Sequence, residues 1–199
     1  MSYGLSVYVI DLGLARGAIG SRDEKLRRMI GGRFKRWMAS DDQQFSFEIE
    51  RGAPTRYDAL RAVIDGGPFD EEYAFQYGYS YKLVCEFHGR PCFNNHFSPF
   101  RGDWLETVDK GLSALGIDAV EVAEFSYGSL PAELPRPEHL PSYGEWTVDQ
   151  CRRALAQWEA GTAEQRQALD GEVLAAIESC AKWWRDAVAA DRGIAGFMH

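Results

Sequence analysis

The two ends of the chain restrict its fold more than any other feature. Residues 4–10 alternate Leu5, Val7 and Val9 with Ser6, Tyr8 and Ile10 and are rich in β-forming side chains, which predicts a strand. Residues 193–199 form an apolar tail that is too short for a helix and suited to a strand beside residues 4–10. Both termini should therefore meet in one sheet.

Most of the chain between these ends has the apolar spacing of amphipathic helices. The expected helix starts carry capping residues or an opening proline and are Ser21, Pro54–Thr55, Asp103, Thr147 and Thr162. Residues 71–87 fit both a helix and a strand, and we favour a helix. A second short strand is expected over residues 45–49. We expect an α+β fold: a helix-rich single domain with a small, mostly antiparallel sheet joining the N- and C-terminal strands.

A proline-rich segment interrupts this pattern between residues 128 and 144. Its prolines are Pro131, Pro135, Pro137 and Pro141. Neither a helix nor an interior strand persists through such a run, so the segment should run extended over the surface. A chain of 199 residues is long enough to form one core. Within a single domain, 1–199, we expect an α/β lobe at 1–127, a connector at 128–144, and a helical pair with the C-terminal strand at 145–199.

Charge limits the classes of partner. The net charge is −8 at pH 7, and attraction to nucleic acid or to an anionic membrane would have to overcome the field of the whole molecule. Residues 21–36 nevertheless hold seven basic and two acidic side chains, which gives +5 there and leaves −13 for the remainder. A solvated helix face that balances acidic neighbours is the simpler interpretation, and a phosphate-binding patch is the alternative.

The sequence also predicts a compartment. It contains no run of eighteen apolar residues, and its first residues lack the basic start and cleavage pattern of a secretory signal. Its four cysteines are spread along a chain that burial alone can stabilise, so no disulfide framework is required. We expect a cytoplasmic protein with reduced thiols.

Polar side chains are concentrated between residues 85 and 103. Four of them belong to types that bind zinc tetrahedrally, namely Cys85, His88, Cys92 and His96. A turn at Gly89 and Pro91 would fold His96 back toward Cys85. Their spacing matches neither the CxxC nor the HxxxH pattern of structural zinc sites, and cysteines packed in a core are the simpler interpretation. We therefore expect no cofactor and keep zinc as the alternative.

A catalytic interpretation of the same stretch takes Cys92 as a thiolate nucleophile, His88 or His96 as its base and Asp103 as the orienting carboxylate. Catalytic partners normally converge from different elements, and the short separation here makes that geometry hard to build. The sequence therefore leaves catalytic residues unassigned and does not decide whether the protein is an enzyme.

The loop between residues 94 and 104 is better interpreted as a recognition surface. Amides, guanidinium groups and aromatic rings are typical of surfaces where proteins meet. The candidate binding residues are Asn94, Asn95, His96, Arg101 and Trp104. Arg101 also precedes an expected helix N-terminus, where backbone N–H groups favour an anion. In the simpler alternative, Phe97, Phe100 and Trp104 merely hold the loop to the core.

Several landmarks together resemble a known family. They are Met1-Ser2-Tyr3-Gly4 before the first strand, Ser21-Arg22-Asp23-Glu24, Tyr77-Gly78-Tyr79 and the closing Gly193-Ile194-Ala195-Gly196-Phe197. With these landmarks the chain resembles an uncharacterised family of bacterial proteins of roughly 200 residues, a domain of unknown function. The resemblance implies a bacterial cytoplasmic setting and carries over no catalytic residues.

Two hypotheses of function follow. The first is a non-enzymatic binding protein, regulatory or of the kind that neutralises a toxin or effector, which recognises a protein partner with the loop at 94–104 while its acidic surface steers the encounter. The second is a small metal-dependent or anion-binding enzyme with a site around residues 85–103. A weaker third hypothesis is phosphate or nucleic-acid contact through residues 22–36. The oligomeric state is not indicated by the sequence.

Overall fold

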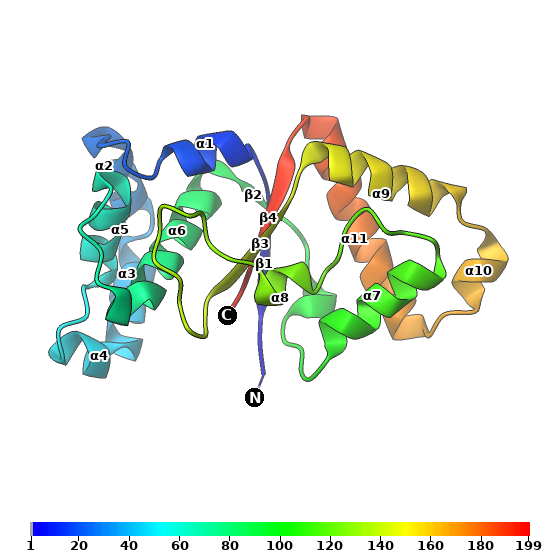
Figure 1. The fold of residues 1–199 in the computed structure, drawn as a ribbon, viewed down its shortest axis with the longest axis horizontal. Helices are drawn as coiled ribbons and strands as arrows, with labels where there is room; N and C mark the ends of the chain where they lie inside the picture. Colours follow the sequence, from blue (N-terminus) through cyan, green and yellow to red (C-terminus); the bar gives the residue numbers. More distant parts are fainter. Residues whose placement is uncertain (1) are drawn as a thin grey trace. The chain divides into compact units, whose positions relative to one another are not determined.

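The structure is a computed structural model that describes residues 2–199 and has an α+β fold rich in helices (Figure 1). The chain divides into two compact units. Among the described residues, the sheet unit contains 2–12, 89–128 and 143–199, and the helical unit contains 13–88 and 129–142. These units do not follow the expected lobes at 1–127 and 145–199, and the organisation as a single domain stays a prediction.

A four-stranded sheet has the order β2–β1–β4–β3. Its strands are β1 (Leu5–Ile10), β2 (Arg90–Pro91), β3 (Ser142–Trp146) and β4 (Gly193–Met198). Strands β1 and β4 pair in antiparallel register along their whole length, from Leu5 opposite Met198 to Ile10 opposite Gly193. The prediction that the two ends of the chain meet in one small antiparallel sheet is confirmed, and so is the α+β fold class.

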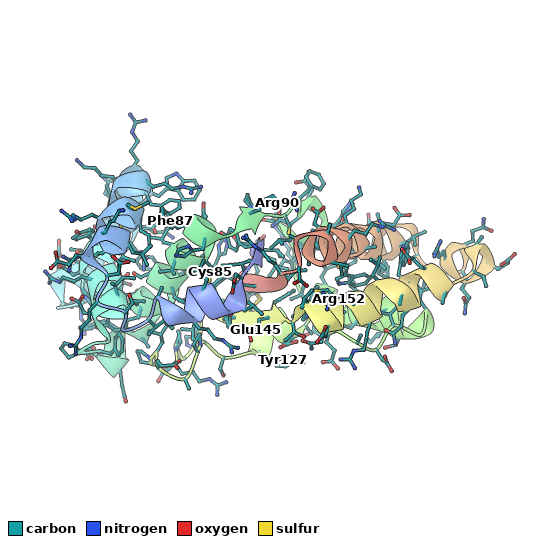
Figure 2. The ribbon with its side chains drawn as sticks, turned by 90° about the horizontal axis from the view of Figure 1, so that it is seen from above. Cys85, Phe87, Arg90, Tyr127, Glu145 and Arg152 are labelled. Atoms are coloured by element: carbon teal, nitrogen blue, oxygen red, sulfur yellow. The ribbon has the colours of Figure 1, made fainter. Side chains whose placement is uncertain are left out.

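The helices of the sheet unit provide its core. They are η2 (Asn95–Phe97), α7 (Trp104–Ala114), α8 (Glu124–Tyr127), α9 (Val148–Ala160), α10 (Ala163–Gln167) and α11 (Gly171–Ala190). Helix α11 packs against α9 and α7, and α9 and α11 form the expected pair (Figure 1). Arg152, which Figure 2 labels on α9, forms ion pairs with Asp149 and with Asp191 at the end of α11.

Three tryptophans fill the centre of this core. The rings of Trp183 and Trp184 on α11 both lie 6.4 Å, centroid to centroid, from the ring of Trp146 on β3. Adjacent helical residues point about 100° apart, so both rings are buried only because α11 is covered on two sides. The second half of α11 therefore lies in the interior of the sheet unit.

The helical unit is built around α5 and α6, which pack against each other. Its elements are α1 (Leu12–Gly17), α2 (Glu24–Arg33), α3 (Lys35–Gln44), α4 (Ser46–Glu50), α5 (Arg56–Asp65), η1 (Glu71–Tyr73) and α6 (Ala74–His88). Thr55 caps α5 by accepting the N–H of Asp58, and Gly66 ends the helix in the left-handed conformation. These boundaries, and the helix preferred over a strand at residues 71–87, are confirmed.

The second expected strand, over residues 45–49, is wrong because this segment forms helix α4. Its alternation of apolar and polar residues does not reflect burial, since the side chain of Phe47 is 63% exposed. Phe45 instead packs beside Phe75 and Tyr79, with ring centroids 5.2 and 5.7 Å away. The pattern on which the prediction rested was therefore accidental.

The expected helix caps have mixed outcomes. Thr147 and Gln150 form the predicted capping box. Asp23 rather than Ser21 caps α2, with Oδ1 accepting the N–H of Leu26 at 2.9 Å. Asp103 makes no side-chain cap on α7. Thr162 caps the short helix α10 and not the longest helix, α11, which begins after its own cap at residue 170.

The proline-rich segment differs from an exposed connector. Leu130, Leu134 and Pro141 are buried, and residues 142–144 enter strand β3. A Cβ added to Gly78 would lie 2.9 Å from Pro141 and 3.1 Å from Leu130, so this part of the segment packs directly on the backbone of α6.

Across residues 2–199, none of the helices is both long and apolar enough to cross a membrane.

Candidate functional site

The loop at residues 92–103 of the sheet unit is fixed to the sheet at both ends. At its start, the N–H of Cys92 donates to the carbonyl of Val7 at 2.8 Å. Near its end, Tyr3 and Phe100 exchange backbone hydrogen bonds of 2.9 Å in both directions. Between these points Phe97 is fully buried beside Trp183, at 5.2 Å between ring centroids. The loop is thus held in place by backbone hydrogen bonds near both ends and by one buried ring between them.

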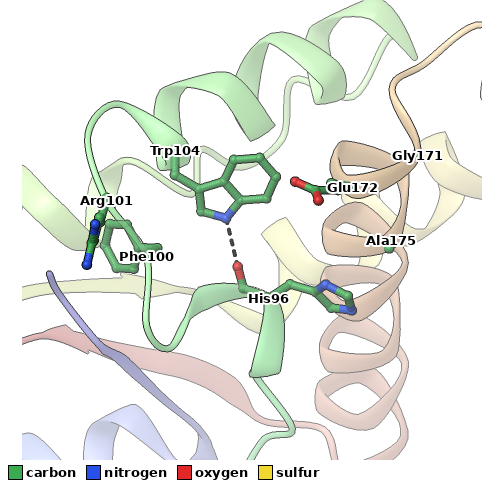
Figure 3. Close-up of a pocket in the computed structure, with 7 residues that line it drawn as sticks. All are labelled: His96, Phe100, Arg101, Trp104, Gly171, Glu172 and Ala175. Atoms are coloured by element: carbon green, nitrogen blue, oxygen red, sulfur yellow. Dashed lines mark hydrogen bonds between the residues drawn. The ribbon is translucent and has the colours of Figure 1, made fainter.

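The second half of this loop borders a hollow of about 460 Å³, which we name the loop hollow (Figure 3). The loop and the start of α7 supply His96, Phe100, Arg101 and Trp104, and the first turns of α11 supply Gly171, Glu172 and Ala175. The indole Nε1 of Trp104 donates to the carbonyl oxygen of His96 at 2.7 Å. This bond joins the start of α7 to η2, and both segments line the hollow on the loop side.

The loop hollow brings opposite charges together. Arg101 and His96 are exposed on the loop side, and Glu172 is exposed on the α11 side. The N–H groups of Glu172 and Val173 are occupied by the capping carboxylate of Asp170, at 2.9 and 3.2 Å. A peptide that carries both polar and apolar side chains suits this lining better than an isolated anion does.

Three of the five predicted binding residues, His96, Arg101 and Trp104, line one hollow. Asn94 has a structural role, because its side-chain amide donates to the carbonyl of Leu5 and secures the loop on β1. Asn95 is exposed at the start of η2 and does not line the hollow. Sequence reasoning missed the wall supplied by α11, which lies some seventy residues further along the chain. No spacing rule connects residues that far apart.

The exposed ring of Phe93 was also overlooked. Its side chain is 62% exposed at the start of the loop, while its carbonyl accepts the indole N–H of Trp183 at 2.7 Å. The buried tryptophan thereby holds the backbone of Phe93 in place and leaves the ring outside. A large apolar side chain held out by a rigid backbone is a common anchor in protein interfaces.

The four predicted metal ligands do not form a metal site in the structure. Cys85 lies buried on α6 (Figure 2) and His88 ends the same helix, whereas Cys92 and His96 belong to the sheet unit. Within residues 2–199, no group of three or more His, Cys, Asp or Glu side chains is placed to hold a metal ion. The described side chains therefore give no support to the zinc alternative.

The nucleophile hypothesis receives no support from Cys92. Burial, followed by the nearby carboxylate of Asp186, raises the pKa of the Cys92 thiol to about 12. A catalytic thiolate needs the opposite shift, toward or below neutral pH. At neutral pH this cysteine remains a protonated, half-buried side chain.

The other side of α7 lines a second cavity of about 540 Å³, which we name the acidic hollow. Its charged lining residues are Glu106, Asp109, Lys110, Asp118 and Glu121. Asp109 accepts the N–H groups of Val122 and Ala123 at 2.6 and 2.9 Å, and its burial raises the pKa of the carboxyl group. The acidic hollow therefore combines one structural carboxylate with exposed ones.

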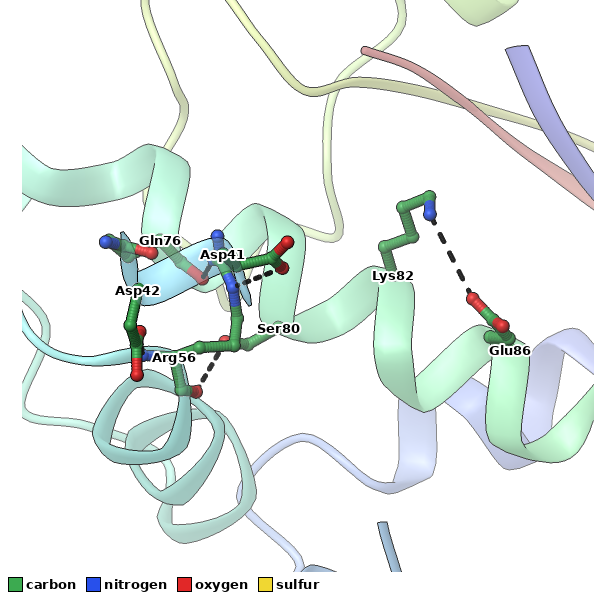
Figure 4. A network of polar contacts seen from close by, with 7 residues as sticks. All are labelled: Asp41, Asp42, Arg56, Gln76, Ser80, Lys82 and Glu86. Atoms are coloured by element: carbon green, nitrogen blue, oxygen red, sulfur yellow. Dashed lines mark hydrogen bonds and ion pairs between the residues drawn. The ribbon is translucent and has the colours of Figure 1, made fainter. Parts of the chain in front are cut away.

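The helical unit contains a different polar cluster, centred on the fully buried side chain of Arg56 (Figure 4). Its Nε donates to Asp41 at 3.2 Å and its Nη1 to the carbonyl of Gln76 at 2.9 Å. The guanidinium lies 4.8 Å from the ring centroid of Tyr79 and 5.6 Å from that of Phe45. Burial lowers the pKa of Arg56, and the charge of Asp41 opposes this shift. The cluster is a structural support for the core of the unit.

Comparison with known proteins places the chain in a family but assigns no activity. Neither the curated proteins nor the solved structures include a match. The model of the family described as "Domain of unknown function (DUF7691)" matches residues 1–199. The chain therefore belongs to this family, DUF7691, a domain of unknown function.

Proposed function

We propose that this protein is a non-enzymatic binding protein, regulatory or of the kind that neutralises a toxin or effector, which recognises a protein partner with the loop at residues 94–104. One observation carries the proposal: His96, Phe100, Arg101 and Trp104 surround the loop hollow together with the first turns of α11. Aromatic and guanidinium groups beside a concave surface are the features that anchor protein partners. Phe93 extends the same loop with an exposed ring.

The charge of the sheet unit favours a basic partner. This unit holds nine Lys and Arg against sixteen Asp and Glu, which leaves −7, so most of the net charge of −8 lies in it. Such a field raises the encounter rate with a basic protein and disfavours acidic ones. The acidic hollow contributes part of this field on the unit that also carries the loop. Steering by the acidic surface and docking by the loop are the two parts of the proposal.

The setting proposed for this activity is the bacterial cytoplasm, with the four thiols reduced, in a family of chains of about 200 residues. The landmarks that the chain shares with an uncharacterised bacterial family support this setting. The alternative function, an anion-binding enzyme, is favoured by Arg101 and His96 lining one hollow beside the start of α11. It is disfavoured by Glu172 in the same hollow and by the capped N–H groups behind it.

Site-specific photocrosslinking in the native cell tests the proposal. A photoreactive side chain at the exposed position Asn95, next to the hollow, should give one discrete protein adduct on illumination. The same group at Gln165, exposed on α10 of the same unit, should not give it. Arg101→Glu should abolish the adduct, whereas Arg153→Glu, an equal charge change on α9, should leave at least half of it. The absence of any adduct, or identical adducts from both positions, would refute docking through this loop.

A further inference from the structure

A third cavity, of about 420 Å³, lies in the helical unit, outside the loop and the acidic hollow. We name it the basic hollow, and its main lining residues are Arg28, Gly31, Gly32, Lys35, Met38 and Tyr57. They come from α2, α3 and α5. Cavities of this size hold small organic ligands the size of a nucleotide.

Two unpaired cations face this hollow. Arg28 and Lys35 are exposed, and within residues 2–199 neither has a carboxylate partner; Arg28 Nε makes only a 3.4 Å contact to the carbonyl of Glu24. The hollow lies in the +5 segment at residues 21–36, whose field concentrates anions near it. Two free cations at one concave site are suited to a phosphate group.

Packing explains one of the two adjacent glycines in α2 but not the other. A Cβ on Gly31 would lie 2.7 Å from Cε2 of Tyr57, so the tyrosine ring requires glycine there. A Cβ on Gly32 would meet nothing within 4 Å. Glycine inside a helix is unfavourable relative to alanine, and no neighbour compensates for it at position 32. Because Gly32 borders the hollow, close approach of a ligand to the bare backbone would account for this residue.

The other walls suit a planar ring. The ring of Tyr57 lies on Gly31 and remains 39% exposed, while the buried side chain of Met38 gives an apolar wall. Asp42 also lines the hollow, and its Oδ1 accepts the backbone N–H of Arg56 at 2.7 Å. Its second oxygen can accept a hydrogen bond from a hydroxyl or amino group of a ligand.

We propose that the basic hollow binds an organic phosphate with a planar ring, of the nucleotide class. Arg28 and Lys35 hold the phosphate groups, Gly32 lets them approach the helix backbone, and Tyr57 and Met38 contact the ring. The proposal uses residues of the helical unit only and does not depend on the proposed function of the loop. Either can fail without the other.

Calorimetric titration of the full chain with ADP tests this site, with adenosine and inorganic phosphate as partial ligands. We expect saturable binding of one ADP per chain, at least tenfold tighter than either partial ligand. Lys35→Glu should weaken ADP binding at least tenfold. Lys25→Glu makes the same charge change on the exposed side of α2, outside the hollow, and should alter the affinity less than threefold. Equal losses in both variants would show a general field effect and overturn the site.

Gly32→Ala separates binding from folding. Gly32 lies in the last turn of α2, without a positive φ and with open space at its Cβ, so alanine should not lower the thermal midpoint of this variant, whereas ADP affinity should fall at least fivefold. A single-stranded oligonucleotide of twenty bases is titrated in parallel. No ADP binding at millimolar concentration, or binding of the oligonucleotide without ADP, refutes the nucleotide-class ligand. Unchanged affinity in Gly32→Ala refutes the close approach to the α2 backbone.

Discussion

The two units of this protein both have apolar cores, but among residues 2–199 only the core of the helical unit contains a fully buried charged side chain. The sheet unit buries rings and thiols: Trp146, Trp183 and Trp184 are at most 1% exposed, and Cys151 and Cys180 are fully buried. The helical unit buries a charge, that of Arg56, and surrounds it with a carboxylate, a backbone carbonyl and two aromatic rings. The first core depends on the fit of apolar shapes. The second also contains a guanidinium that donates hydrogen bonds through Nε and Nη1, while its Nη2 has no hydrogen-bond partner among residues 2–199.

Their surfaces differ as well. The sheet unit carries −7, whereas the helical unit carries thirteen basic against fourteen acidic side chains and is almost neutral at −1. The net charge of the helical unit is the sum of two oppositely charged parts: residues 21–36 carry +5, and the remainder of the unit carries −6. A net charge therefore describes the sheet unit well and the helical unit poorly.

The largest expected effect is a low reactivity of the buried thiols in the sheet unit. Burial raises the pKa of Cys92 and Cys151 to about 12. At pH 8 each should hold roughly a thousandfold less thiolate than an unperturbed thiol. Because the pKa is higher in the folded state than in the unfolded state, these protonated thiols contribute to the free energy of unfolding. The contribution is complete below the ordinary thiol pKa and is lost as the pH rises toward about 12. The thiolate is the form that iodoacetamide alkylates, so both cysteines should react slowly. Peptide mass spectrometry measures the alkylation rate of each cysteine.

Ser40→Cys, which places an exposed thiol on α3 of the helical unit, is the matched control and should react at an ordinary rate. Native Cys92 reacting within tenfold of this control would contradict the burial of the thiol.

Trp184→Ala should have the largest effect on stability. The side chain is completely buried beside Trp146, so its removal leaves a cavity and should lower the free energy of unfolding by about 3–5 kcal/mol. Urea denaturation followed by circular dichroism measures the change. Arg185→Ala, at the next and exposed position of α11, should change it by less than about 0.5 kcal/mol. A loss below about 1 kcal/mol for Trp184→Ala would show that the core is not closely packed.

Arg56→Met tests the charged core of the helical unit. Methionine keeps much of the volume but removes the donors to the carboxylate of Asp41 and, beside the intrahelical bond, to the carbonyl of Gln76, so the free energy of unfolding should fall by about 2–3 kcal/mol. Arg61→Met on the same helix removes an exposed ion pair to Asp58 and should cost at most about 0.5 kcal/mol. A stabilised Arg56→Met variant would mean that the desolvation of the guanidinium outweighs its bonds.

The helix caps give the smallest expected differences. Asp23→Ala removes a carboxylate that accepts the N–H of Leu26 and should cost about 1 kcal/mol. Asp103→Ala removes a side chain that makes no cap on α7 and should cost no more than about 0.3 kcal/mol. Both changes are measured by urea denaturation. A reversed order would show that Asp103 caps α7 in solution.

Local sequence signals predicted much of the fold. The strands at both chain ends, the bounds of α5, the helix expected at residues 71–87 and the helix start at Thr147 follow from short patterns. All are present in the structure, where residues 71–88 form η1 and α6. The wrong prediction at residues 45–49 has a tertiary cause. At residues 45–49 the alternation was that of a strand, yet Phe47 is exposed and Phe45 packs on α6, so tertiary contacts decided the conformation.

The candidate site could be predicted only in part. The loop with His96, Arg101 and Trp104 stands out in the sequence because its polar and aromatic side chains are close together along the chain. The α11 wall of the loop hollow could not be found in this way. Likewise, the +5 segment was visible, but the hollow between its Arg28 and Lys35 depends on Met38 below and on Tyr57 from another helix.

The sequence by itself determined most of the element types, the strand character of both chain ends and the uneven charge, because each depends on residues near one another in the chain or on composition. Only the tertiary structure decided which side chains share a cavity, which carboxylate caps a helix, and that a charged arginine is buried while a phenylalanine is exposed. The physical reason is that burial and hydrogen bonding are settled by neighbours in space. In this protein many of those neighbours are tens of residues apart.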